Sequence, residues 1–409
     1  MATADAAAPA TRSSDGRFAV VITEVSANYK VATRAEGRAE DVFYVRKTTM
    51  RKRDEWTQLR VGDRVELNFR FASGRAIVSD AVPLPPSPPP SPSGSSATVT
   101  VEPRDATPRP SVHKIDAHLH IWSNGSAPFE WASEPPAALH SVATAEKMRD
   151  AGERAGVGGA LIVQPANHKF DHSYVAAALQ KHPDYFRGMM LVDGSLPPLE
   201  AVASLESLWR QGFVAARFNP SLFPAGLDGP TGKALFKRCG ELSMPVGIMT
   251  FTGLMPHLQA IRALAALTPT DLIIDHMGFF RQPATGGLVG EAAANDEAAW
   301  EALLSLADLP NVHVKLSAFF RLSAALPPHR DLEARVAALV AAFGARRLLW
   351  GSDFPFVIIG GNTPTDAGCS YAQASAQLGS WSVPGLDDDA YRAIMGGNAQ
   401  RLFGFWETP

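Results

Sequence analysis

The chain has 409 residues, of which 46% are hydrophobic and 19% are charged, and its formal net charge is -3. This composition excludes a largely disordered chain, and the net charge argues against a protein that binds nucleic acid along its whole surface. Cys239 and Cys369 are its two cysteines, too few for a disulfide framework or a cysteine-rich zinc site.

The first 17 residues are rich in Ala, Ser and Thr, and we predict a flexible start over residues 1–17. Arg12 and Arg17 would suit an organelle-targeting segment, but Asp5 and Asp15 argue against one. No run of about 18 apolar residues occurs, so we expect no membrane-spanning helix. We therefore expect a cytoplasmic protein, with import into an organelle left open.

Residues 18–82 contain short runs of β-branched and aromatic residues separated by turn residues. The predicted strands are 18–25, 41–47, 64–71 and 75–82. Short strands at this spacing predict a small all-β barrel.

The runs DVFYVRK and LRVGDRVELNF in this segment resemble a cold-shock-type domain, which is an oligonucleotide-binding (OB) barrel. The resemblance implies that Phe43, Tyr44 and Trp56 stack bases above a basic groove. The first family motif departs from the pattern, because NYKVATRAE holds one aromatic residue, Tyr29. We favour these aromatics as barrel core, and nucleic-acid binding by residues 18–82 is the alternative.

Residues 83–112 predict a spacer between two folded parts. Seven of the ten residues in PLPPSPPPSP are proline, which lacks the backbone N–H and has a fixed φ. The chain is mildly basic before this tract and acidic after it.

Residues 113–409 alternate apolar strand-like runs with amphipathic helices. The predicted strands are 114–122, 160–164, 187–193, 214–219, 245–249, 272–278, 312–318 and 348–355. The predicted helices are 144–156, 199–212, 257–267, 296–309 and 331–344. Apolar strands with helical crossovers predict a parallel sheet, and eight such units favour a closed (β/α)8 TIM barrel. An open doubly wound sheet is the alternative, but no Gly-rich loop follows the first strand.

Polar residues end four of these strands, where a barrel of this type carries its chemistry. His118 and His120 are two residues apart on the first strand and point to the same face. Arg217, His276 and Asp353 end the fourth, sixth and eighth strands, so we expect all five side chains in one cavity. Asp116 is predicted to bond backbone at the rim and is left out of the site.

The HxH at 118–120, the DH at 275–276 and the WGSDFP at 350–355 resemble the amidohydrolase superfamily. They are most similar to its amidohydrolase-related branch, which holds sugar-acid and dicarboxylate lactonases and several decarboxylases. The resemblance covers residues 113–405 and implies an amidohydrolase-type, lactonase-like hydrolase.

In metal-bound relatives the HxH pair and the last Asp hold a divalent ion, with a further ligand on the fourth or fifth strand. This chain has Arg217 and Met249 there, and neither suits a metal. His118, His120 and Asp353 would still suffice for one zinc ion. The 2-pyrone-4,6-dicarboxylate lactonases work without metal, so a metal-free site and a Zn- or Mn-dependent hydrolase or decarboxylase both stay open.

We predict a hydrolase of a small carboxylated lactone or a related ester or amide. The resemblance implies that Arg217 binds the substrate carboxylate, that His118, His120 and His276 donate to the carbonyl oxygen, and that Asp353 activates water. Loop residues are further candidates for substrate contact: Asn167, His168, His172 and Arg321.

Overall fold

The computed structural model forms two compact units, residues 1–102 and 103–409, which are described separately. In the first unit it describes the backbone of residues 16–25, 29–34, 42–46, 64–72 and 75–83. In the second it describes residues 111–251, 253–280, 291–360, 368–404 and 406, apart from the side chains of 291–296.

The first unit contains a five-stranded antiparallel sheet of order β3-β2-β1-β4-β5. Its strands are β1 (Gly16–Val25), β2 (Tyr29–Arg34), β3 (Val42–Arg46), β4 (Arg64–Ala72) and β5 (Arg75–Pro83). Four of them match the predicted runs, and β2 lies in the stretch NYKVATRAE, where no strand was predicted. Pro83 pairs with Val65, so the sheet takes the first residue of the predicted spacer. A proline is tolerated there because β5 ends the strand order.

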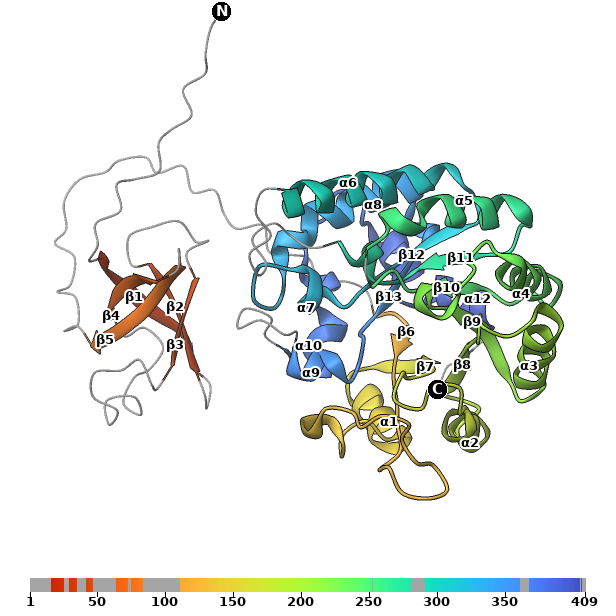
Figure 1. Ribbon diagram of the computed structural model, residues 1–409. Helices are drawn as coiled ribbons and strands as arrows, with labels where there is room; N and C mark the ends of the chain where they lie inside the picture. Colours follow the sequence, from red (N-terminus) through yellow and green to blue (C-terminus); the bar gives the residue numbers. More distant parts are fainter. Residues whose placement is uncertain are drawn as a thin grey trace, which may run out of the picture. The chain divides into compact units, whose positions relative to one another are not determined.

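The second unit is an eight-stranded parallel barrel whose strands follow one another in chain order (Figure 1). The strands are β6 (Lys114–Leu119), β7 (Val157–Val163), β8 (Phe186–Leu191), β9 (Phe213–Phe218), β10 (Val246–Ile248), β11 (Leu272–Ile274), β12 (Val312–Ser317) and β13 (Leu348–Gly351). The last strand returns to the first, because Leu119 bridges Phe354 and the N–H of His120 donates to the Phe354 carbonyl at 2.7 Å. The predicted TIM barrel is confirmed, and the open sheet is excluded.

Helices surround the strands on the outside (Figure 1). They are α1 (Ala145–Arg154), α2 (Ser173–Lys181), α3 (Pro198–Arg210), α4 (Pro230–Glu241), α5 (Leu258–Leu267), α6 (Glu291–Ser305), α7 (Phe319–Leu322), α8 (Glu333–Phe343), α9 (Phe356–Ile359), α10 (Tyr371–Ala376), α11 (Asp388–Arg392) and α12 (Asn398–Phe403). All five predicted helices are present. Among the longer helices, α2 and α4 were not predicted, and in α4 the residues Gly232 and Gly240 lower the helix propensity. Among the described residues, no helix is both long and apolar enough to span a bilayer.

The C-terminal segment covers the end of the barrel where the strands begin. Leu402, Phe403 and Trp406 pack with strand residues such as Ile115 and Leu161 in one apolar cluster. The Trp406 indole N–H donates to the carbonyl of Tyr185, the residue before β8, at 2.8 Å. The strand ends that carry the polar residues are therefore at the other end of the barrel.

Candidate active site

The side chains predicted to meet do lie together at the C-terminal ends of the strands. The ring of His118 lies 4.4 Å from that of His276 and 5.2 Å from that of His120, measured between centroids. The Nε2 atom of His120 is 3.5 Å from Oδ1 of Asp353. One nitrogen or oxygen atom each of His118, His276 and Asp353 lies within 4.8 Å of the other two. All four side chains are buried, and together they form what we call the cup.

The backbone is strained where it aims these side chains. His276 has φ 51° and Asp353 has φ 60°, and both values lie in the left-handed region that non-glycine residues avoid. Met277 and Phe279, which follow His276, and Ala318, which follows β12, also have positive φ. Such conformations cost on the order of 1–3 kcal/mol each and cluster where a site requires them.

Asp353 is a buried carboxylate surrounded by cationic and imidazole groups. Its Oδ2 accepts a hydrogen bond from Nε of Arg321 at 3.0 Å. Burial would raise the pKa of Asp353, but the facing His276, the contact with His120 and the charge of Arg321 outweigh burial and lower that pKa well below its usual range. Asp353 is therefore ionised at neutral pH. Arg321, which was predicted as a substrate contact, thus also contacts the predicted base directly.

A second buried carboxylate, Asp275, lies beneath the cup with two cations. Its Oδ1 is 3.2 Å from Nζ of Lys315, and its Oδ2 is 3.3 Å from Nε of Arg217. Burial would raise the pKa of Asp275, but Lys315, His118 and Arg217 lower it well below its usual range. Within the described part of the chain, no hydrogen bond engages the Nη atoms of Arg217, so the forked end of its guanidinium is available among these residues.

The histidines differ in what they can donate. Nδ1 of His120 lies 2.8 Å from the carbonyl of Val163, so it carries the proton. Its other ring nitrogen, Nε2, faces Oδ1 of Asp353, which differs from its predicted role as a donor to the substrate. His276 places Nδ1 2.8 Å from the Ser317 hydroxyl, and burial lowers its pKa to about 4, so it is neutral at pH 7.

The loop after β7 divides its predicted contact residues into two groups. Asn167 and His168 each keep one buried side-chain nitrogen without a partner among the described residues. His172 uses both ring nitrogens on backbone, with Nδ1 2.9 Å from the Phe170 carbonyl and Nε2 accepting from the Leu191 N–H at 3.0 Å. The geometry of His172 therefore supports a role in holding the loop against β8.

Further buried polar atoms without partners in the described part of the chain lie at the same end of the barrel. Gln164 Oε1 and Thr250 Oγ1 belong to residues at the ends of β7 and β10, and neither was predicted as a site residue. The sequence feature that could have indicated both residues is a polar residue at the end of an apolar strand-like run. Buried polar groups are almost always hydrogen-bonded, so this concentration indicates a place that a polar ligand or water fills.

Asp116 joins the first and last strands. Its Oδ1 accepts from the N–H groups of His118 and Ser352, both at 3.0 Å. Its Oδ2 accepts from the hydroxyls of Ser352 at 2.5 Å and Tyr371 at 2.8 Å. The prediction that Asp116 bonds backbone is confirmed, but it does so from within β6, fully buried, and not at the rim. It anchors the residues next to both His118 and Asp353.

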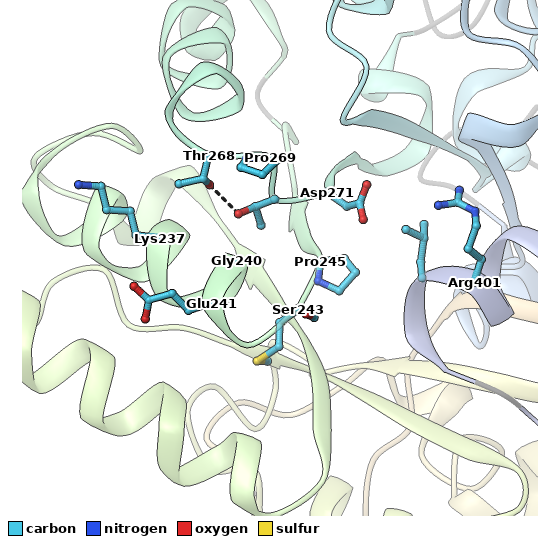
Figure 2. Close-up of a pocket in the computed structure, with 12 residues that line it drawn as sticks. Lys237, Gly240, Glu241, Ser243, Pro245, Thr268, Pro269, Asp271 and Arg401 are labelled. Atoms are coloured by element: carbon cyan, nitrogen blue, oxygen red, sulfur yellow. Dashed lines mark hydrogen bonds between the residues drawn. The ribbon is translucent and has the colours of Figure 1, made fainter.

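A separate cavity of about 600 Å³ lies at the opposite end of the barrel (Figure 2). Its lining includes Pro245 and Asp271, which directly precede β10 and β11, and Arg401 of α12. Asp271 is already engaged by His313, whose Nε2 lies 2.8 Å from its Oδ1. Because TIM barrels carry their chemistry at the C-terminal ends of the strands, we do not assign the active site to this cavity.

Comparison with known proteins agrees with the arrangement of the cup. The amidohydrolase family model matches residues 115–405. The chain belongs to the amidohydrolase family. This match spans the whole barrel from β6 to the end of α12.

Two curated relatives of this amidohydrolase are named as hydrolases of lactones. It is 27% identical over 296 residues to an L-fucono-1,5-lactonase of Burkholderia ambifaria, covering 71% of this chain and 95% of the relative. It is 28% identical over 242 residues to a 4-sulfomuconolactone hydrolase of Rhizobium radiobacter, covering 59% of this chain and 75% of the relative. The prediction of an amidohydrolase-type, lactonase-like hydrolase is confirmed.

A solved structure has the same barrel. The putative 2-pyrone-4,6-dicarboxylic acid hydrolase of Pseudomonas putida matches with a TM-score of 0.53 and 25% identity, covering 73% of this chain and 99% of that one.

The cup does not fit the resident divalent ion that the amidohydrolase family suggests. The three candidate ligands are His118, His276 and Asp353, so His276 stands where the sequence predicted His120. Arg217, Lys315 and Arg321 supply three positive charges around Asp275 and Asp353, which supply two negative ones. A dication would thus enter a site that already holds an excess positive charge. Met249, at the end of β10, adds no favourable ligand.

Proposed function

We propose that this amidohydrolase hydrolyses a small carboxylated lactone without a metal, with Asp353 as the base. The observation that carries the proposal is the buried, ionised Asp353, which contacts Arg321 and His120 and lies close to His118, whose Nε2 has no partner among the described residues. A carboxylate held in this way can take a proton, and the surrounding cations can bind an anionic substrate.

Binding would begin with the substrate carboxylate. The forked end of Arg217, which has no hydrogen-bond partner among the described residues, accepts a bidentate carboxylate, and the partly exposed Arg321 offers a second anchor. If a substrate carboxylate engages Arg321, part of its charge is withdrawn from Asp353. Asp353 then becomes a stronger base when substrate is present than when the cup is empty.

The reaction would follow in two proton transfers. Water attacks the lactone carbonyl carbon while Asp353 takes a proton from that water. His118 and His276 donate hydrogen bonds to the oxyanion that forms on the carbonyl oxygen. The acyl carbon–ring oxygen bond then breaks, and protonated Asp353 returns its proton to the leaving alkoxide. The products are an alcohol and a new carboxylic acid on one chain, and the acid then loses the second proton of the water to solvent.

The test is a panel of lactones with and without a ring carboxylate, assayed with the wild type and Asp353→Asn. We expect hydrolysis of carboxylated members and a loss of kcat of about a hundred-fold or more in the variant. Asp150→Asn makes the same chemical change on the exposed surface of α1 and is the matched control. If Asp353→Asn hydrolyses the same lactone as fast as the control, Asp353 is not the base.

For the first unit we propose an OB-like barrel. The support is its strand order, in which β1 lies between β2 and β4. Backbone contacts between β3 and β5, measured by nuclear Overhauser effects, would close the barrel, and their absence would leave an open sheet. Nucleic-acid binding by residues 18–82 receives no support from the comparisons, and the side chains that would perform it lie outside those the structure describes. We do not include it in the function.

A further inference from the structure

Lys315 is a buried cation that the proposed reaction does not use. It lies in the middle of β12, it is 0% exposed, and every residue of that strand is buried. Its Nζ lies 3.1 Å from Nδ1 of His118 and 3.2 Å from Oδ1 of Asp275. Burying an ammonium is costly unless partners hold it, so its contacts are where a role should be found.

The contact with His118 has a direction. An ammonium has three hydrogens and no lone pair, so it can only donate. A neutral imidazole has one N–H and one lone pair. When Lys315 donates to Nδ1, the imidazole proton must therefore be on Nε2.

Asp275 lies close enough to favour the opposite arrangement. Its Oδ1 is 3.3 Å from the same Nδ1, and an N–H there would suit a carboxylate. Neither oxygen of Asp275, however, has a hydrogen bond of acceptable geometry within the described part of the chain, whereas the contact of Lys315 with Nδ1 has one. Asp275 thus acts as the counter-ion of Lys315 and Arg217 and leaves Nδ1 to the lysine.

The other ring nitrogen of His118 is the one without a partner. Nε2 is buried and has no hydrogen bond among the described residues. The ring lies against His276, and the ligating atoms of His118, His276 and Asp353 cluster within 4.8 Å. An N–H on Nε2 of His118 would lie beside the proposed base, Asp353. It could donate a hydrogen bond to the carbonyl oxygen of a bound substrate.

We propose that Lys315 is a positioning residue that holds His118 in the tautomer with the proton on Nε2. This tautomer makes His118 a hydrogen-bond donor to the substrate and leaves no lone pair for a metal. The donation to substrate rests on the proposed function, whereas the tautomer does not. Without Lys315, Nδ1–H can turn to Asp275 and the Nε2 lone pair can face the cup, which is the arrangement of a histidine metal ligand.

The tautomer can be read directly from long-range ¹H–¹⁵N correlations of the imidazole rings in protein labelled on histidine. The His118 signals are assigned as those lost in His118→Gln. We expect an unprotonated Nδ1 and a protonated Nε2 in the wild type, and the reverse in Lys315→Met. Lys315→Gln, whose amide can still donate to Nδ1, should keep the wild-type tautomer. Lys114→Met, at the start of the same strand as His118, is the matched control and should change nothing.

A second readout is the affinity for zinc, measured by equilibrium dialysis and metal analysis. We expect Lys315→Met to bind zinc at least tenfold more tightly than the wild type and the Lys114→Met control. We also expect its kcat on a hydrolysed lactone to fall about a hundred-fold with little change in KM, because one donor to the oxyanion is lost.

Protonated Nδ1 in the wild type, or an unchanged tautomer in Lys315→Met, would overturn the inference, and the wild-type measurement does not depend on a variant folding. Stoichiometric zinc binding by the wild type through His118 would overturn it as well. A protein with the expected tautomer that hydrolyses no lactone would refute the proposed function and leave this inference standing. An active lactonase with the proton on Nδ1 of His118 would refute this inference and leave the proposed function standing.

Discussion

Tyr371→Phe tests the hydrogen bonds of Asp116, which join the first and last strands of the barrel. The Tyr371 hydroxyl donates to Oδ2 of Asp116 at 2.8 Å, while its ring contacts Phe354 at 5.7 Å between centroids. The substitution removes the hydroxyl and keeps the ring. Burial raises the pKa of Asp116 to about 6, so Asp116 is an ionised acceptor at pH 8.

A hydrogen bond to a charged group contributes about 1.5–3 kcal/mol, so we expect Tyr371→Phe to lower the free energy of unfolding by that amount at pH 8. In a barrel of this size, this corresponds to a fall in Tm of roughly 3–12 °C. Unfolding followed by tryptophan fluorescence measures it. Tyr174→Phe removes a hydroxyl that accepts from the neutral Ala145 N–H, and should cost only about 0.5–1.5 kcal/mol. A Tyr371→Phe protein as stable as the wild type would refute the hydrogen bond from Tyr371 to an ionised Asp116.

The pH dependence of stability in Asp116→Asn tests the raised pKa of the same residue. The pKa of Asp116 is higher in the folded protein than in the unfolded chain. The stabilisation that this difference gives to the folded state is therefore complete below pH 4 and is lost as the pH rises through about 6. The shift corresponds to about 3 kcal/mol. The stability of the wild type relative to Asp116→Asn should therefore fall between pH 4 and pH 7. A relative stability that rises over this range would contradict the assignment.

Three further predictions concern the cup and its loop. Burial lowers the pKa of His276 to about 4, so kcat/KM should stay constant down to about pH 5, and an acidic limb between pH 6 and 7 would contradict this. Arg217→Lys should lower kcat/KM for carboxylated lactones at least tenfold more than for uncharged lactones, because the forked contact is lost; equal losses would exclude carboxylate binding by Arg217. Burial lowers the pKa of His172 to about 4, so its contribution to stability is lost as the pH falls from 6.5 to 4. The loss is about 3 kcal/mol, and urea unfolding of His172→Gln should lack it.

The strands could be predicted from the sequence because buried parallel strands are continuous apolar runs. The errors lie at the ends that carry the chemistry. The sixth and eighth strands were predicted to run to residues 278 and 355, but they end at Ile274 and Gly351. The predicted strands were carried through the polar pairs at 275–276 and 352–353, whereas the backbone turns to a positive φ at His276 and Asp353. Periodicity reports which residues are buried and does not report such turns.

The site was predictable as a set of strand ends, and its internal pairing was not. Lys315 is the fourth residue of an apolar strand, and nothing local shows that its partners are Asp275, 40 residues earlier, and His118 on another strand. The contact of Arg321 with Asp353 depends likewise on two loops that meet only in the folded barrel. A lysine within a fully buried strand was the signal available for Lys315.

The most direct test of the account is the hydrolysis of a carboxylated lactone by protein from which metal has been removed, comparing the wild type with Asp353→Asn. With metal analysis below about a tenth of an equivalent, we predict undiminished turnover by the wild type and a loss of about a hundred-fold or more in the variant. Activity that disappears with the metal and returns in proportion to added zinc would contradict the account.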